Sequence, residues 1–207
     1  MIIGIPVYDG VDLLDVTGPH EIFNWMSPSP DVRLIADTPR SITTRDGFTF
    51  IAPNGYAAVP HLDVLWVPGG APEALKLLMS GADRSYLDFL IDRSRHARFV
   101  CSVCEGALLL AAAGLLDGYC ATTHWAFIPC LKEFPEIEVA HGHPRFVHDR
   151  NRLTGGGVSS GLDEALKLVE LLSGYAAAQD VQQNIQYYPD PPVKSVIPPT
   201  DKCPFVW

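Results

Sequence analysis

Apolar runs of strand length alternate with longer stretches of helical periodicity along most of the chain. The strand-like runs are IIGIPVY at residues 2–8, VRLIAD at 32–37, VLWVP at 64–68 and FVCSV at 99–103. Helices are predicted at residues 14–25, 74–79, 86–95, 106–116, 162–172 and 176–187. Strands that alternate with helices in this way predict a doubly wound α/β fold around a mostly parallel sheet.

Two hairpins and a proline-rich tail depart from this alternation. Turn signals at residues 46–47 and 149–151 predict hairpins over 41–54 and 146–154. The tail has prolines at positions 189, 191, 192, 198, 199 and 204, so it cannot form a regular helix or a central strand. We therefore expect one domain over residues 1–188 and an extended C-terminal arm over 189–207.

Composition narrows the class of protein. An apolar content of 47% and a charged content of 19% over 207 residues are typical of one globular domain. A net charge of −9, with no basic run, argues against a nucleic-acid partner. No membrane span is expected, because no run of about 20 apolar residues occurs. The five cysteines do not form the even pattern of a secreted disulfide framework, so we expect a cytoplasmic protein whose thiols persist.

Candidate chemistry lies where the apolar run at residues 99–103 meets the predicted helix at 106–116. The stretch SVCEG at 102–106 has small residues two positions before and after a cysteine, which is the pattern of a nucleophile elbow. Such a turn displays the cysteine at the start of a helix, where the helix dipole lowers the thiol pKa. Cys104 is therefore the predicted nucleophile, and the backbone N–H of Glu105 is a candidate oxyanion donor.

A second cysteine, Cys101, raises the alternatives of a redox pair or a zinc clip. Alternate residues of a strand face opposite ways, so the side chains of Cys101 and Cys104 should diverge and Cys101 should lie in the core. No second CxxC accompanies the first. His141 and His143 would share one face of a strand, but two ligands alone do not make a metal site. We therefore expect no bound metal.

Other polar residues lie near predicted strand ends. His124 follows a short strand that begins at Cys120, and it is either a site residue or a hydrogen-bonded structural histidine. Asp12 suits the cap of the first helix, whereas Asp15, between apolar neighbours, can point at the elbow. The glycines at 155–157 lack the Lys-Ser/Thr of a phosphate loop and are interpreted as allowing close backbone approach beside the elbow.

Together these pieces resemble the DJ-1/PfpI superfamily of class I glutamine amidotransferase-like proteins, and within it the isonitrile hydratase branch. The matching stretches are LLDVTGP (13–19), LWVPGGA (65–71), SVCEGALLLAAAGLLDG (102–118), ATTHWA (121–126) and RLTGGGVSSGLDEALKLVE (152–170). The resemblance implies a flavodoxin-like three-layer sandwich, a homodimer, a small-molecule substrate and no metal or organic cofactor. It carries the nucleophile onto Cys104 and the acid onto Asp15. It also places a backbone N–H of the Gly69-Gly70 turn, that of Gly70, opposite the cysteine.

One position departs from the pattern of this branch. Isonitrile hydratases have threonine after the nucleophile and protease-like relatives have histidine, whereas this chain has Glu105. We expect the Glu105 side chain to point to solvent and to interact with the helix dipole, since an inward carboxylate would raise the thiol pKa. The resemblance implies an isonitrile hydratase-type lyase. The alternatives are a glyoxalase-like or amidase reaction at Cys104, and a redox-sensing or ligand-binding protein.

Overall fold

The fold is built on a seven-stranded sheet. The computed structural model describes residues 1–205. Its strands are β1 (Ile2–Pro6), β2 (Asp31–Ala36), β3 (Arg40–Thr43), β4 (Thr49–Ala52), β5 (Asn54–Gly55), β6 (Val64–Val67), β7 (Phe99–Ser102), β8 (Cys120–Ala121), β9 (Glu138–Val139), β10 (Phe146–Asp149) and β11 (Arg152–Gly155). Seven of them lie in the order β10-β11-β7-β6-β1-β2-β5. All neighbours in this sheet are parallel except β10 and β11, which form the expected second hairpin.

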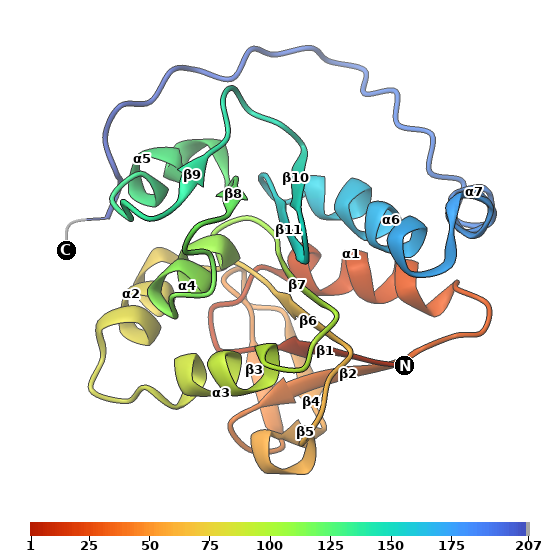
Figure 1. Ribbon diagram of the computed structural model, residues 1–207, viewed down its shortest axis with the longest axis horizontal. Helices are drawn as coiled ribbons and strands as arrows, with labels where there is room; N and C mark the ends of the chain where they lie inside the picture. The colour runs from red at the N-terminus through yellow and green to blue at the C-terminus, as the bar shows by residue number, and fades with distance from the viewer. Residues whose placement is uncertain (206–207) are drawn as a thin grey trace.

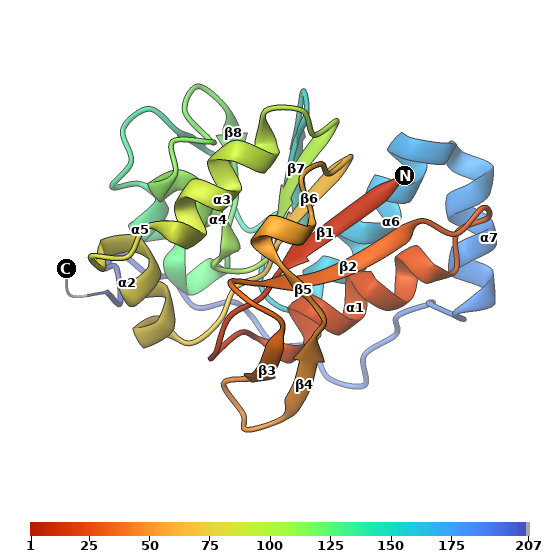
Figure 2. The same ribbon diagram turned by 90° about the horizontal axis from the view of Figure 1, so that it is seen from below.

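Helices cover both faces of the sheet. They are α1 (Leu13–Asn24), α2 (Pro72–Ser80), α3 (Ser85–Ser94), α4 (Gly106–Ala112), α5 (Ile128–Leu131), α6 (Ser160–Ser173) and α7 (Tyr175–Asn184), with the 3-10 turns η1 (Tyr56–Ala58) and η2 (Trp125–Phe127). Helices α1, α6 and α7 lie on one face, and α2, α3, α4 and α5 lie on the other (Figures 1 and 2). The three-layer α/β sandwich expected from the sequence is confirmed.

The central strands form the core because both of their faces are covered. All four residues of β6 are buried, and so are three of the four in β7. Trp66 of β6 meets the ring of Phe23 edge-on, with centroids 5.4 Å apart. Its indole N–H donates to the backbone carbonyl of Asp15 at 3.1 Å. This bond attaches the first turn of α1 to the middle of the sheet.

Element boundaries differ from the predicted ones mainly at α4. The sequence predicts a helix over residues 106–116, but α4 ends at Ala112. Gly114 takes a φ of +69°, a left-handed conformation that ends a helix readily at glycine. The β3–β4 hairpin and the short strand at Cys120 form where they were predicted. The segment of His141 and His143 is not a strand, since β9 ends at Val139.

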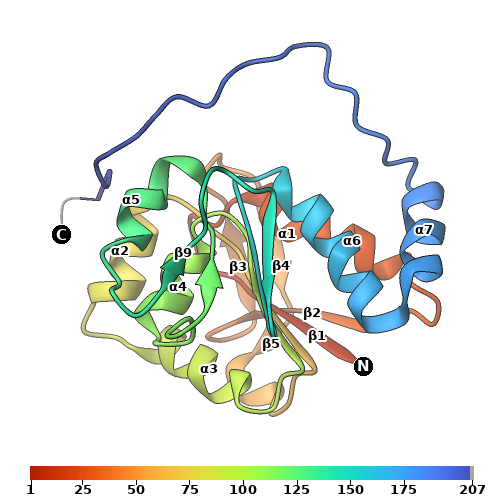
Figure 3. The ribbon, with the colours of Figure 1, turned by 45° about the horizontal axis from the view of Figure 1, so that its top comes forward.

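The C-terminal segment runs as an arc from α7 to α5 (Figure 3). Its described part, residues 185–205, contains no helix or strand. A disulfide joins Cys203 of this segment to Cys130 of α5. The prediction that all cysteines persist as thiols is therefore wrong for this pair, because folding brings together two cysteines 73 positions apart. Cys101, Cys104 and Cys120 are free, as expected for a Cys101–Cys104 pair that does not bridge.

Candidate active site

The loops after β1, β6, β7 and β11 meet at one edge of the sheet, and Cys104 lies among them. Its backbone has a φ of +57°, which is strained for a residue other than glycine. Its N–H donates to the carbonyl of Gly156 at 2.8 Å, so the glycine-rich loop approaches the elbow as predicted. A Cβ on Gly106 would lie 2.1 Å from the carbonyl oxygen of Val67. The turn therefore requires glycine at that position, which explains the elbow pattern.

Asp15 is a fully buried carboxyl on the first turn of α1. Its Oδ2 accepts a hydrogen bond from the backbone N–H of Gly69 at 2.9 Å, and its Oδ1 has no hydrogen-bond partner among the described residues. Burial raises the pKa of Asp15 well above its usual value, and the charge of Asp12 adds to this shift. Burial thus favours the protonated form of Asp15. Asp12, in contrast, caps α1 by accepting from the N–H of Leu14, as predicted.

Glu105 points inward, so the prediction of a solvent-facing side chain is wrong. Only 3% of its surface is exposed, and it makes no capping hydrogen bond to α4. Its Oε2 lies against Gly69, 2.5 Å from the place where a Cβ would be, and the Cβ of Cys104 lies 2.9 Å from that same point. The missing side chain of Gly69 therefore makes the room in which the carboxyl and the cysteine stand together.

The thiol of Cys104 is held neutral. Burial raises its pKa well above the usual value, and the charges of Asp15 and Glu105 and the interaction of the thiol with the Glu105 carboxylate raise it further. A backbone N–H of Val158 opposes this shift. The expected lowering of the thiol pKa by the helix dipole is thus wrong, because two carboxyls and burial outweigh a seven-residue helix.

A cavity of about 200 Å³ opens onto Cys104. It is lined by Arg45, Gly70, Pro72, Cys104, Glu105, His124, Phe127 and Val158. Every predicted site residue except Asp15 lines this space, and Asp15 is near enough to Cys104 for its charge to raise the pKa of the thiol. Arg45 was not predicted. It comes from the β3–β4 hairpin, with no motif to mark it, and approaches Asp12 at 3.5 Å.

His124 is a half-buried wall residue of this cavity rather than a partner of the thiol. Its Nδ1 accepts from the N–H of Ala126 at 3.2 Å and so caps η2. Burial lowers the pKa of His124, and the charge of Arg45 lowers it further, so the imidazole is neutral. The neighbouring Thr123 hydroxyl donates to the carbonyl of Cys104 at 2.8 Å. His124 is therefore hydrogen-bonded and also borders the cavity.

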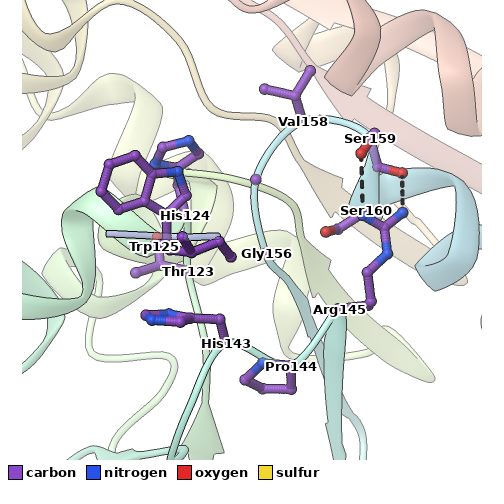
Figure 4. A pocket seen from close by; sticks show the side chains of 12 residues that line it. Thr123, His124, Trp125, His143, Pro144, Arg145, Gly156, Val158, Ser159 and Ser160 are labelled. Atoms are coloured by element: carbon purple, nitrogen blue, oxygen red, sulfur yellow. Dashed lines mark hydrogen bonds between the residues drawn. The ribbon is translucent and has the colours of Figure 1, made fainter. Parts of the chain in front are cut away.

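A second cavity, of about 340 Å³, adjoins the first through His124 and Val158 (Figure 4). Trp125, His143 and Arg145 line it, and Ile197 of the C-terminal segment also contributes. Arg145 is held by the hydroxyl and the carbonyl of Ser159, drawn as dashed lines in Figure 4. Within residues 1–205, no group of three or more His, Cys, Asp or Glu side chains is arranged to hold a metal ion. No helix of that part of the chain is long and apolar enough to cross a membrane.

The strained cysteine, its two buried carboxyls and the parallel sheet define a class of protein. The model of the DJ-1/PfpI family matches residues 1–171, and the chain belongs to this family. Isonitrile hydratase of Pseudomonas putida is 39% identical over 198 residues, which are 96% of this chain and 83% of that protein. The HTH-type transcriptional regulator GbdR of Pseudomonas aeruginosa is 31% identical over 151 residues, which are 72% of this chain and 37% of the regulator.

Solved structures agree with the fold. A ThiJ/PfpI family protein from Pseudomonas syringae superimposes with a TM-score of 0.82 at 34% identity, covering 93% of this chain and 77% of that chain. DJ-1beta of Drosophila melanogaster has a TM-score of 0.79 at 17% identity, covering 89% of this chain and 97% of that chain. The second likeness concerns the fold alone.

Proposed function

We propose that the protein adds water to a small isonitrile and releases an N-substituted formamide, with Cys104 as the nucleophile. The observation that carries this proposal is the position of Cys104, at a strained elbow that opens into a small cavity and lies near the buried carboxyl of Asp15. The identity of 39% to isonitrile hydratase over nearly the whole chain supports the same reaction.

The first step joins the sulfur of Cys104 to the terminal carbon of R–N≡C, and the thiol proton passes to a base in the site. That carbon takes a proton from the Asp15 carboxyl, and a thioimidate, Cys–S–CH=N–R, results. The backbone N–H groups of Gly70 and Glu105 are the donors assigned to the charge that develops as the adduct forms. Asp15 leaves this step as a carboxylate.

The second step adds water to the C=N carbon of the thioimidate. Asp15, now ionised, takes a proton from the water, and the nitrogen gains the proton that the thiol released in the first step, giving a tetrahedral carbon that bears S, OH and NHR. The C–S bond then breaks, the hydroxyl becomes the formamide carbonyl, and Cys104 regains a proton. The sum is isonitrile plus water to formamide, with no change of oxidation state.

The direct test incubates the purified protein with cyclohexyl isocyanide and follows N-cyclohexylformamide by chromatography. We expect turnover by the native protein and by Cys120→Ser, which removes a free cysteine away from the cavity. Cys104→Ser should lose at least about 1,000-fold of the activity, because a hydroxyl is a far weaker nucleophile here. Absence of formamide from native protein with a reduced Cys104 would reject the proposal in favour of a ligand-binding role.

A further inference from the structure

Glu105 carries a buried carboxyl that the reaction proposed above leaves without a task. It follows Cys104 in the sequence and lines the same cavity, and only 3% of its surface is exposed. Its Oε2 has no hydrogen-bond partner among the described residues. An unpaired buried carboxyl oxygen costs folding free energy. Its position next to the Cys104 thiol therefore indicates a role in the reaction.

The space that holds this carboxyl is specific to it. Gly69 lies in the loop after β6. A side chain would not fit there, because Glu105 Oε2 and Cys104 Cβ both lie within 3 Å of the place where its Cβ would be. Asp15 binds the N–H of the same Gly69. The two carboxyls therefore approach one glycine through different atoms, Asp15 from α1 and Glu105 from the start of α4.

The two carboxyls differ in what opposes the effect of their burial. Burial raises the pKa of both, but at Glu105 the interaction with the Cys104 thiol acts in the opposite direction, whereas at Asp15 the backbone N–H of Gly69 does so. Glu105 is thus the carboxyl whose pKa the thiol lowers by direct interaction, and burial raises the pKa of the thiol itself well above its usual value.

A neutral thiol must lose its proton as its sulfur attacks, so the reaction needs a base close to Cys104. We infer that the Glu105 carboxylate is the catalytic base that takes the Cys104 thiol proton while the S–C bond forms. This inference rests on the proposed isonitrile hydration. The proton moves from sulfur to the carboxylate, and the electron pair of the S–H bond becomes the S–C bond.

The same proton is used in the later steps, so the reaction balances. Protonated Glu105 gives its proton to the nitrogen as water adds to the thioimidate, while Asp15 takes the proton of the water. As the C–S bond breaks, Glu105 takes the proton of the adduct's hydroxyl and returns it to the departing sulfur. Both carboxyls and the thiol end in their starting states, with no other reagent than water.

Several neighbouring charges act on Glu105 and influence the pH at which it ionises. Asp12 and Arg45 have opposite effects on its pKa, and the charge of Glu105 in turn acts on Tyr8 and Cys104. The titratable or charged groups that face it are Tyr8, Asp12, Asp15, Arg45, Cys104 and His124. Arg45, the one cation among them, is paired with Asp12.

Glu105→Gln tests the inference because it moves two reactions of Cys104 in opposite directions. Turnover of cyclohexyl isocyanide should fall by about 100-fold or more, which is the usual contribution of a general base. Alkylation of Cys104 by iodoacetamide, followed on its own peptide by mass spectrometry, should become faster at the same pH. The reason is that loss of the Glu105 charge lowers the thiol pKa and populates the thiolate. The exposed Glu136→Gln is the control and should change neither rate.

If both rates fall, Glu105 has a structural role, and if both rise it only suppresses the thiol; either result overturns the inference. The native protein gives a second test that needs no variant. Its turnover should rise with pH in a lower range than its alkylation, because the first follows Glu105 and the second follows Cys104. Coincident pH profiles would overturn the inference. A native protein that alkylates at Cys104 but never converts the isocyanide rejects the proposed function itself, and with it this role of Glu105.

Discussion

At the scale of residues, buried carboxyls are the main feature of the site and of the core next to it. Asp15, Glu105 and Glu164 all have side chains that are almost or fully buried. Glu164, on α6, lies against Gly155 of β11, and neither of its oxygens has a hydrogen-bond partner in the described residues. Burial raises the pKa of Glu164 well above its usual value, and the charge of Asp15 adds to the shift. Folding therefore favours the protonated form of Glu164.

Glu164→Gln should make the protein relatively more stable as pH rises. A carboxyl whose pKa is raised by folding stabilises the native state fully below its unfolded pKa, and this contribution is lost as pH increases towards the folded pKa. The variant has no such loss, so its free energy of unfolding should gain on that of the native protein by up to about 1.4 kcal/mol per pH unit. Urea unfolding at several values between about pH 5 and 8 measures this difference. If the difference in the free energy of unfolding between the two proteins did not change with pH, the pKa of Glu164 would not be raised by folding.

At the scale of elements, the elbow between β7 and α4 determines where the thiol lies. Gly106→Ala would place a Cβ 2.1 Å from the carbonyl of Val67, so the turn must open. We expect a loss of about 3 kcal/mol in the free energy of unfolding, as for an overpacked core, together with loss of turnover.

Gly118→Ala is the matched control for this substitution. Gly118 has a φ of +70° but nothing within 4 Å of its Cβ position, so alanine there should cost only about 1 kcal/mol of backbone strain and keep activity. Chemical denaturation measures both losses. Equal losses would show that contact with Val67 does not constrain the elbow.

Local pattern predicted most elements and the sharp turn at Cys104, because strand periodicity and the small residues at 102 and 106 are features of the chain itself. The orientation of Glu105 could not be predicted in the same way. A carboxylate at the start of a helix interacts favourably with the helix dipole, which favours an outward side chain. The inward position is available only because Gly69, in the loop after β6, has no side chain. Arg45 was missed for a similar reason, since it reaches the cavity from a distant hairpin.

At the scale of the whole molecule, the C-terminal segment is attached beside the site. The disulfide from Cys203 to Cys130 brings Phe205 onto Phe127, with ring centroids 5.2 Å apart. Phe127 lines the cavity of Cys104, and Ile197 lines the neighbouring one. The C-terminal segment thus packs against the wall of one cavity and lines the other.

Cys203→Ser should lower the free energy of unfolding by about 2–4 kcal/mol, since the disulfide closes a loop between cysteines 73 positions apart. Urea unfolding of the variant and of native protein treated with a reductant should give the same midpoint. Cys120→Ser, which removes a free thiol, should leave the midpoint close to that of the oxidised native protein. An unchanged midpoint for Cys203→Ser would mean that the bridge does not stabilise the fold.

The proposed reaction passes through a covalent adduct between Cys104 and the isonitrile carbon. To detect it, the protein is mixed with excess cyclohexyl isocyanide and quenched with acid within the first turnover, and the mass of each cysteine peptide is determined. We expect one added isocyanide on the Cys104 peptide, absent in Cys104→Ser, which disappears as N-cyclohexylformamide accumulates. Formamide that accumulates with no adduct at Cys104, or equally in Cys104→Ser, would contradict it.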